Sequence, residues 1–381
     1  MLTARTSKTD PGEAAEDLLN QIGSFRTKLG IMYASRDRDH LALNRAIRER
    51  LPPGTPFLGA SSAGEIDNDG LHFGSVVLTT LGGDVEVGIG LGTKLSEDGV
   101  RAGVDAVTDA AGQLGHRPED LNPRTDVGIV IDDGYRRRKE ALLFGVLEKN
   151  PALFLVGGGA SDPERDPSKR SALVHANDRV ETDAAAVVLL RTESPFRVLR
   201  SHWYVPSGQI LRITRVDDTH KRALRIDGAP AARRYAEALG VSVDELGGNP
   251  RLFSSRPTAL RVGREYFIHA PSMVLPDGSI LFEHLLDEGT EYEVMSPGDP
   301  LEITRRFLDE QVPRRVPSPR GMLVFHSSER YASAEASGHL GALSGMFRSK
   351  MPIAGFNVEA EIYCGFSVNN TLATLVFGSD D

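Results

Sequence analysis

Three segments of the chain combine small residues with a carboxylate, which suits them to binding a small polar molecule. They are Ser61-Ser-Ala-Gly-Glu65, Gly157-Gly-Gly-Ala-Ser-Asp162 and Asn357-Val-Glu-Ala-Glu361. Small residues let a ligand approach the backbone closely, and hydroxyl, amide and carboxylate groups then select its polar atoms. Glycines after strands also serve tight turns alone, so each segment taken singly has a second explanation. Their recurrence in matching positions favours a ligand site.

The candidate ligand-binding residues come from these segments and from the strand end near residue 327. They are Ser61, Ser62, Gly64, Glu65, Gly158, Gly159, Ser161, Asp162, Ser327, Arg330, Asn357, Glu359 and Glu361. Glu65 and Glu361 could accept hydrogen bonds from an ammonium or amide group, or could cap backbone N–H groups and pair with an arginine. Arg330 could bind a carboxylate through two hydrogen bonds, or form a structural salt bridge.

Patterns typical of catalytic or metal sites are missing from the sequence. There is no P-loop, dinucleotide fingerprint, nucleophile elbow or His-Glu-x-x-His motif. His326 is the best-placed histidine, and we treat it as a weak candidate for haem ligation. Cys364 is the only cysteine, which excludes a disulfide framework and a cysteine-based zinc site. We expect no catalytic residues and no resident metal or cofactor. One alternative is an enzyme, a hydrolase or transferase, that uses Glu65 or Glu361 as general base.

The elements around these segments repeat along the chain. Four residues of the first region recur in the last at a constant offset: Pro56, Gly59, Glu65 and Ile66 correspond to Pro352, Gly355, Glu361 and Ile362. Hydrophobic spacing predicts a strand at 30–34, a helix with Leu43, Ile47 and Leu51 on its inner face, and a strand at 56–60. A similar order is predicted from 322 to 377, with one helix marked by Ala336, Leu340, Leu343 and Phe347, and a last strand at 371–377.

A looser third copy lies between the other two, with strands at 127–131, 152–156 and 185–190 and a helix at 141–147. From 202 onwards, alternating patterns predict hairpins, and an alanine-rich helix at 231–239 is ended by Gly240. We therefore predict an α/β (mixed α+β) fold of two related domains, built from strand-helix-strand units with mixed β-sheets. The expected division is a flexible tail at 1–22, one domain at 23–198 and a second at 199–381.

Length and composition restrict the class of protein. The 381 residues fit two domains of about 150–200 residues each. Apolar residues make up 40% of the chain, and no apolar run reaches the roughly 20 residues that a membrane helix needs. The first twenty residues lack the apolar core of a secretory signal. A net charge of −9 argues against nucleic-acid binding, and the basic run Arg136–Lys139 is most simply a solvated face. We expect a cytoplasmic protein.

Several motifs together resemble the FIST family of sensory proteins. The sequence Gly59-Ala-Ser-Ser-Ala-Gly-Glu-Ile66 resembles the Gly-Cys-Ser-Thr-Ala-Gly-Glu-Ile motif of the FIST N domain, and Val156–Asp162 resembles its second glycine-rich motif. Three segments are similar to motifs of the FIST C domain: Phe325–Arg330, Gly355–Ile362 and Asn369–Thr371. Departures from the family pattern include Ser327 in place of a cysteine, Asn357 in place of a tyrosine and Glu359 in place of a tyrosine.

The resemblance implies a sensor made of a FIST N and a FIST C domain. Such a sensor binds a small ligand, amino-acid-like in some members, and signals to an output protein. Here we expect a bacterial, stand-alone protein whose partner is a separate chain such as a histidine kinase or cyclase. Some family members are haem-based nitric oxide sensors, which is the alternative for this chain. The acid and amide gained by the third segment imply a ligand preference set by that segment.

Overall fold

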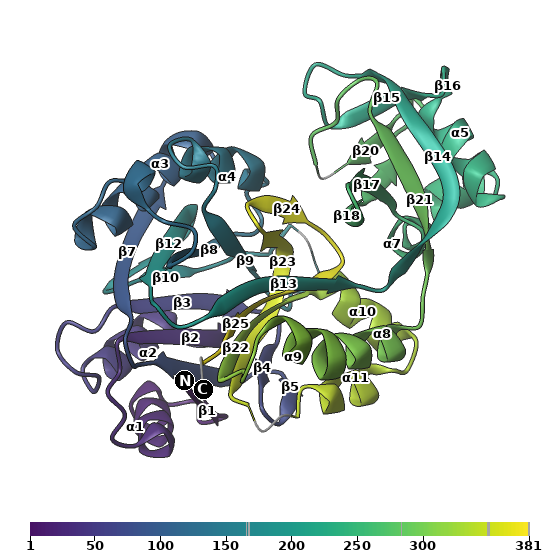
Figure 1. Ribbon diagram of the computed structural model, residues 1–381. Helices are drawn as coiled ribbons and strands as arrows, with labels where there is room; N and C mark the ends of the chain where they lie inside the picture. The colour runs from purple at the N-terminus through teal and green to yellow at the C-terminus, as the bar shows by residue number, and fades with distance from the viewer. Residues whose placement is uncertain (165, 167, 283, 349–350, 380–381) are drawn as a thin grey trace. The chain divides into compact units, whose positions relative to one another are not determined.

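The protein is described by a computed structural model that covers residues 1–164, 166, 168–282, 284–348 and 351–379. The fold is α/β with mixed sheets, as predicted (Figure 1). The chain divides into two compact units. Unit 1 comprises residues 1–201, 304–367 and 372–381, and unit 2 comprises 202–303 and 368–371. Unit 2 is thus largely an insertion into the sequence of unit 1.

Unit 1 contains three strand-helix-strand segments. The first is β2 (Leu29–Ser35), α2 (His40–Arg48) and β3 (Phe57–Ser62). The second is β8 (Asp126–Asp133), α4 (Lys139–Leu147) and β9 (Phe154–Ala160). The third is β22 (Gly321–Ser327), α10 (Ser328–Ala336), α11 (Leu340–Met346) and β23 (Ile353–Tyr363). In each segment the two strands are parallel neighbours, so their carboxyl ends meet at one edge of a sheet.

Antiparallel strands flank the parallel strands of each segment, which lie in a six-stranded sheet (first segment) and an eleven-stranded sheet (second and third segments). The strands β6 (Val76–Leu81), β12 (Ala184–Arg191) and β25 (Thr371–Phe377) pair with β2, β8 and β22. Beyond them lie β1 (Leu2–Thr6), β7 (Glu86–Thr93) and β13 (Phe196–His202). The last strand of the chain has the bounds that its apolar run predicted.

Short strands join the three segments in a closed cycle. After β3 the chain continues into β4 (Glu65–Asp67), which pairs with β23 of the third segment. The second half of β23 pairs with β9 of the second segment. After β9 the chain continues into β10 (Val174–Ala176), which pairs with β3 of the first segment. Each segment therefore supplies backbone to its neighbour. The end of β3, the end of β9 and the middle of β23 lie close together.

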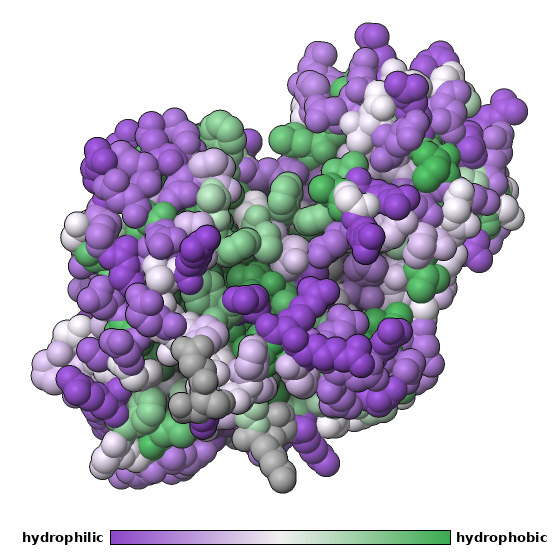
Figure 2. Space-filling model, in the orientation of Figure 1, coloured by the Kyte–Doolittle hydropathy of each residue, from purple (hydrophilic) through white to green (hydrophobic). Residues whose placement is uncertain are grey.

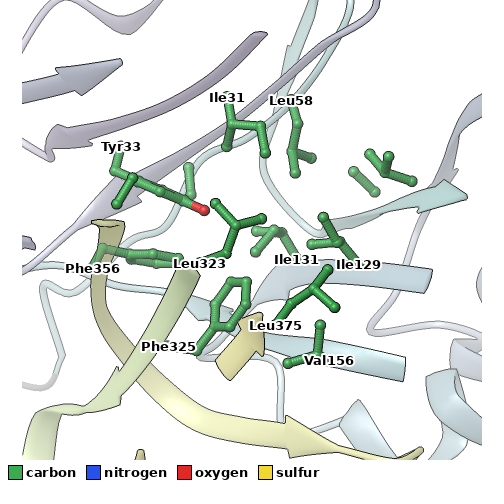
Figure 3. Packing of buried hydrophobic residues seen from close by; sticks show 14 of the residues in the cluster. Ile31, Tyr33, Leu58, Ile129, Ile131, Val156, Leu323, Phe325, Phe356 and Leu375 are labelled. Carbon is green, nitrogen blue, oxygen red and sulfur yellow. The ribbon is translucent and has the colours of Figure 1, made fainter. Parts of the chain in front are cut away.

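The six-stranded and eleven-stranded sheets enclose a shared hydrophobic core, which Figure 3 shows from close by. Ile31 and Leu58 come from the first sheet and Ile129, Phe325 and Leu375 from the second, and their side chains point toward one another. The rings of Tyr33 and Phe356 stack with centroids 4.6 Å apart. Continuous apolar runs in β2, β8 and β22 are needed because helices cover the opposite faces of these strands.

The first 22 residues are folded, which corrects the expectation of a flexible tail. Strand β1 pairs with β6 along its whole length. Helix α1 (Pro11–Ile22) begins after Asp10, whose carboxylate accepts a hydrogen bond from the Glu13 N–H at 2.9 Å. Ala14, Leu18 and Ile22 recur at four-residue spacing and are buried. The cap and the spacing were legible in the sequence, but the acidic residues around them suggested a solvated tail.

The helical region after β22 also differs from its prediction. Two helices, α10 and α11, stand where one was expected, because Gly338 between them adopts a φ of 73°. A positive φ ends a right-handed helix. Leu343 and Phe347 are buried as predicted, whereas Ala336 is exposed.

Further elements of unit 1 lie around this framework. The helices are α3 (Gly99–Gln113), η1 (Pro118–Asp120), α8 (Pro300–Arg306), η2 (Phe307–Gln311) and α9 (Val312–Arg315). The remaining strands are β5 (Gly70–His72), β11 (Arg179–Glu181) and β24 (Phe366–Val368). In Figure 2 the surface over α3 is largely hydrophilic, as expected of a helix with one buried face.

Unit 2 is built on an eight-stranded antiparallel sheet. Its strands are β14 (Tyr204–Val216), β15 (Arg222–Ile226), β16 (Ala229–Pro230), β17 (Thr258–Val262), β18 (Glu265–His269), β19 (Pro271–Val274), β20 (Ile280–Phe282) and β21 (Glu291–Pro297). Its helices are α5 (Ala231–Leu239), α6 (Val243–Gly248) and α7 (Arg251–Ser255). Helix α5 has the predicted bounds and ends at Gly240 with a φ of 71°. Among the described residues, no helix has the length and apolar content to cross a membrane.

Candidate functional site

The three predicted loops meet in a hydrogen-bonded junction inside unit 1. The Ser61 hydroxyl donates to the Ser161 carbonyl at 3.0 Å, and the Ser161 N–H donates back to the Ser61 carbonyl at 3.0 Å. The Ser161 hydroxyl donates to the Asn357 carbonyl and accepts from the Ala63 N–H at 2.9 Å. The Asn357 N–H donates to the Gly64 carbonyl at 2.8 Å. The sequence segments that looked alike are therefore in direct contact.

Glu65 is committed to the structure of its own corner. Its carboxylate accepts hydrogen bonds from the Ser62 hydroxyl, from the Ser75 N–H at 3.0 Å and from the Ser75 hydroxyl at 2.6 Å. The residue is completely buried. Burial raises the pKa of Glu65 to about 7, although the Ser62 and Ser75 hydrogen bonds act in the opposite direction. The sequence allowed two roles for Glu65, ligand binding and the capping of nearby N–H groups. These hydrogen bonds correspond to the capping role.

His326 and Asn357 lie side by side on β22 and β23. Their side chains are fully buried, and His326 Nδ1 lies 2.9 Å from Asn357 Oδ1. Phe347 packs edge-on against the imidazole, with ring centroids 6.0 Å apart. Burial, with a smaller contribution from the Arg330 charge, lowers the pKa of His326 to about 3. Within the described part of the chain, His326 Nε2 and Asn357 Nδ2 have no hydrogen-bond partner.

Arg330 and Ser327 have structural partners. Arg330 is 2% exposed, and its guanidinium donates to the Ser201 carbonyl at 2.8 Å and to the Thr304 hydroxyl at 3.1 Å. The Ser327 hydroxyl caps helix α10 by accepting from the Glu329 N–H at 3.2 Å. These contacts give both residues a role in holding segments of unit 1 together.

Glu359 belongs to a partly exposed group of charges. We name this group the Glu359 cluster, and it consists of Tyr135, Asp162, Arg170, Glu329 and Glu359. Burial raises the pKa of Glu359, Arg170 opposes this change, and the Glu329 carboxylate adds to it. Burial also raises the pKa of Glu329, again opposed by Arg170. The cluster thus combines three carboxylates, those of Asp162, Glu329 and Glu359, with the guanidinium of Arg170.

Tyr135 links this cluster to the second predicted loop. Its hydroxyl accepts a hydrogen bond from the Asp162 N–H at 2.8 Å. Burial raises the pKa of Tyr135, and the Glu359 charge raises it further. A Cβ atom on Gly134 would lie 2.5 Å from the Glu359 Cβ, so glycine at this position makes room for Glu359.

The other predicted residues serve local packing. A Cβ on Gly158 would lie 2.7 Å from Val358 Cβ, and one on Gly159 would lie 2.5 Å from the Glu359 carbonyl oxygen. These glycines let β9 pack against β23. The Asp162 carboxylate accepts from the Glu164 N–H at 2.9 Å and the Ser171 N–H at 3.0 Å. Glu361 is fully buried opposite Gly158 in the β23–β9 pairing.

The basic run after β8 is exposed at Arg136–Arg138, as expected of a solvated face, and differs at Lys139. Lys139 is 7% exposed and forms an ion pair with the buried Asp132. The exposed Arg136 pairs with Asp133 at 2.9 Å. Lys139 therefore belongs to the framework around β8.

Haem does not fit at His326, the candidate haem ligand from the sequence. His326 is completely enclosed, Phe347 covers its ring, and Nδ1 is engaged by Asn357. A porphyrin needs an open face and a free path to the ligating nitrogen. Within the described ranges, no three His, Cys, Asp or Glu residues are grouped as they would be to hold a metal ion.

Three residues of the Glu359 cluster were not among the sequence candidates. Tyr135 follows the end of β8 and Glu329 follows the end of β22, so the strand-end rule that identified Ser327 would have found both. Arg170 lies in the long connection between β9 and β10, where nothing local marks it.

Comparison with known proteins identifies the family. The FIST N domain matches residues 28–229, which is more than half of the chain. The protein belongs to the FIST family. FIST domains are sensory, signal-transduction domains that bind small ligands.

Two further comparisons add little. No curated protein sequence matches the chain. Among solved structures, the crystal structure of a cyanuric acid hydrolase from A. caulinodans is 8% identical, with 100% of this chain and 99% of that chain covered. Its TM-score is 0.37, a likeness too weak to support an argument about fold or function.

Proposed function

We propose that this protein is a cytoplasmic sensor of an amino-acid-like metabolite, bound in unit 1 at the Glu359 cluster beside the junction of the three loops. The observation that carries the proposal is that two carboxylates, Glu359 and Glu329, and the Arg170 guanidinium lie within electrostatic reach of one another in one partly exposed group. A zwitterionic amino acid needs both: an acceptor for its ammonium group and a bidentate donor for its carboxylate.

In this proposal Glu359 and Glu329 accept the ligand ammonium group, and Arg170 binds its carboxylate. Arg170 takes the part first assigned to Arg330, because Arg330 is occupied by Ser201 and Thr304. Asp162 and Tyr135 hold the loop that carries Arg170. The buried candidates Ser61, Ser62, Gly64, Glu65, Gly158, Gly159, Ser161, Ser327 and Glu361 support the frame.

The proposed signalling role follows the family. We assign residues 23–198 to a FIST N-like part and 199–381 to a FIST C-like part, with the output on a separate chain such as a histidine kinase or cyclase. The ligand-binding character of FIST domains supports the sensing half of this assignment. Copurification of the tagged protein with a kinase or cyclase, with and without amino acids, tests the output half.

Thermal unfolding in the presence of each amino acid tests the ligand. A ligand at about 100 times its Kd stabilises the folded state by about 2.7 kcal/mol, which raises the melting temperature measurably. Glu359→Gln and Arg170→Ala are expected to remove the rise for the amino acid that gives it. Glu193→Gln and Arg124→Ala are the matched controls, since both side chains are exposed in other parts of unit 1.

Two results would refute the proposal. One is a screen in which neither amino acids nor their derivatives raise the melting temperature. The other is binding that survives both Glu359→Gln and Arg170→Ala at the affinity of the unaltered protein.

A further inference from the structure

The side-chain amide of Asn357 uses only half of its hydrogen-bonding capacity. Its Oδ1 lies 2.9 Å from His326 Nδ1, while Nδ2 has no partner in the described part of the chain. The residue is 0% exposed. A buried donor left without an acceptor is costly, so it is retained where something else supplies the acceptor.

His326 fixes the direction of this amide. Because its pKa is lowered to about 3, the imidazole is neutral at pH 7 and carries a single proton. That proton on Nδ1 is donated to Asn357 Oδ1. Phe347 holds the imidazole edge-on, so the ring cannot turn away without repacking. The amide therefore presents Nδ2 on the side away from His326.

Gly64 and Phe73 lie on that side. A Cβ on Gly64 would be 2.6 Å from Asn357 Nδ2 and 2.8 Å from Phe73 Cε1. Only the absence of a side chain at Gly64 lets both groups approach. Phe73 is 49% exposed, and its ring packs against Tyr331 with centroids 5.1 Å apart. A half-exposed phenylalanine can rotate outward at lower cost than a core residue.

We infer that Asn357 is a specificity-determining residue, whose Nδ2 donates a hydrogen bond to a neutral carbonyl oxygen of the ligand beneath Phe73. The inference rests on the proposed function, since it concerns a second part of the same ligand. Asn357 and Glu359 are two residues apart on β23, about 7 Å along the strand. An amino acid with a side-chain amide has a comparable length.

The chemistry favours a neutral carbonyl over a carboxylate. Asn357 offers one uncharged donor beside a neutral imidazole, and the guanidinium of Arg330 is engaged by Ser201 and Thr304. A carboxylate buried here would lose its hydration and gain one uncharged donor, because the Arg330 N–H groups are already bonded to Ser201 and Thr304. The subsite therefore selects an amide over the acid of the same shape.

Two pairs of isosteric probes test the inference. L-glutamine is compared with L-glutamate, and L-asparagine with L-aspartate, by calorimetric titration of the full chain. We expect the better-fitting amide to bind about tenfold more tightly than its acid, the effect of one buried hydrogen bond and an avoided unpaired charge. We expect Asn357→Asp to weaken binding of the amide about tenfold and to remove the preference for the amide over the acid.

A second variant keeps the test valid should Asn357→Asp fold poorly. Phe73→Ala leaves Asn357 Nδ2 in place but removes the ring that covers it. The variant should therefore bind the amide several-fold more weakly than the unaltered protein does. The control is Phe144→Ala on α4, where the phenylalanine is 65% exposed. Its affinity for the amide should be unchanged.

The outcomes separate this inference from the proposed function. If amide and acid bind equally and Glu359→Gln abolishes both, the Asn357 subsite is wrong while the sensor proposal stands. A preference for the amide that survives Asn357→Asp would also overturn the subsite, because Nδ2 would then not be the group that selects the amide over the acid. If none of the four probes nor any other amino acid binds, both proposals fail.

Discussion

The corner that follows β3 and the middle of β23, which we call the second corner, have corresponding sequences but distribute their polar groups differently. In the first corner, Glu65 accepts three hydrogen bonds from Ser62 and Ser75 and is closed off from solvent. In the second, Val358 stands at the position of Ser62, and the polar groups are shifted to Asn357 and Glu359. One backbone design thus supports a self-contained corner and a corner with unused hydrogen-bonding capacity.

The two corners also respond to pH in opposite directions. The pKa of Glu65 is raised to about 7 and that of His326 is lowered to about 3, in both cases chiefly by burial. Each group favours its neutral form in the folded state. The difference teaches that equivalent positions in related segments can carry separate tasks, with stability concentrated in one corner and, as we propose, recognition in the other.

The largest expected effect comes from removing the carboxylate that closes the first corner. At pH 5, Glu65→Ala is expected to lower the free energy of unfolding by about 3 kcal/mol, because it leaves the buried Ser75 N–H without its acceptor. Glu359→Ala should cost less than about 1 kcal/mol, since Glu359 is partly exposed. Urea denaturation monitored by circular dichroism measures both. Equal losses would contradict the division of tasks.

A second prediction concerns the pH dependence of the first corner. Between pH 4.5 and 7 the unfolded chain releases the Glu65 proton while the folded chain keeps it, so stability falls as the pH rises. The fall is about 3 kcal/mol at roughly 1.36 kcal/mol per pKa unit. Glu65→Gln has no such proton, so its stability relative to the unaltered protein should increase across this range. A constant difference from pH 4.5 to 7 would show that Glu65 titrates normally.

The second corner should show the reverse behaviour. As the pH falls below 6.5, the unfolded chain protonates His326 while the folded chain does not. By pH 5 this difference removes about 2 kcal/mol of stability. His326→Phe should therefore lose less stability than the unaltered protein between pH 6.5 and 5, and His339→Phe provides the control. Parallel curves for His326→Phe and the unaltered protein would count against a neutral buried imidazole.

The smallest expected effect tests the link between the second corner and the β9 loop. Tyr135→Phe removes the acceptor of the Asp162 N–H and should cost about 1 kcal/mol in a urea titration. The substitution should also weaken the binding of an amino acid at the Glu359 cluster, because Asp162 holds the loop that carries Arg170. A stable variant with unaltered affinity would separate Tyr135 from the proposed site.

Much of the fold could be predicted because its determinants are local. The strand at 371–377 and the helix at 231–239 have their predicted bounds, since a continuous apolar run and a glycine stop are read directly from the sequence. The break at Gly338 was missed because the hydrophobic spacing continues across it. Glycine in a helical pattern is tolerated often enough that its φ is decided by the surrounding packing.

The sequence indicated which segments form the site, but it did not indicate which residues contact one another. Similar segments near the end of β3, the end of β9 and the middle of β23 correctly indicated that Ser61, Ser161 and Asn357 belong together. The task of each charged residue depends on partners far away in the sequence. Arg330 is bound to Ser201 and Thr304, and Arg170 acts on Glu359, contacts that no local pattern encodes. Whether the candidates bind ligand stays a prediction.

The hydrogen bonds of Arg330 have a mechanical consequence. Ser201 is the last residue of unit 1 before the chain enters unit 2, and Thr304 is the first after it returns. One guanidinium is bonded to both. Tension transmitted along the chain from residues 202–303 of unit 2 therefore reaches unit 1 at one reinforced anchor, whereas residues 368–371 of unit 2 are joined to unit 1 separately. Displacing the Arg330 side chain would separate the anchor into two independent tethers.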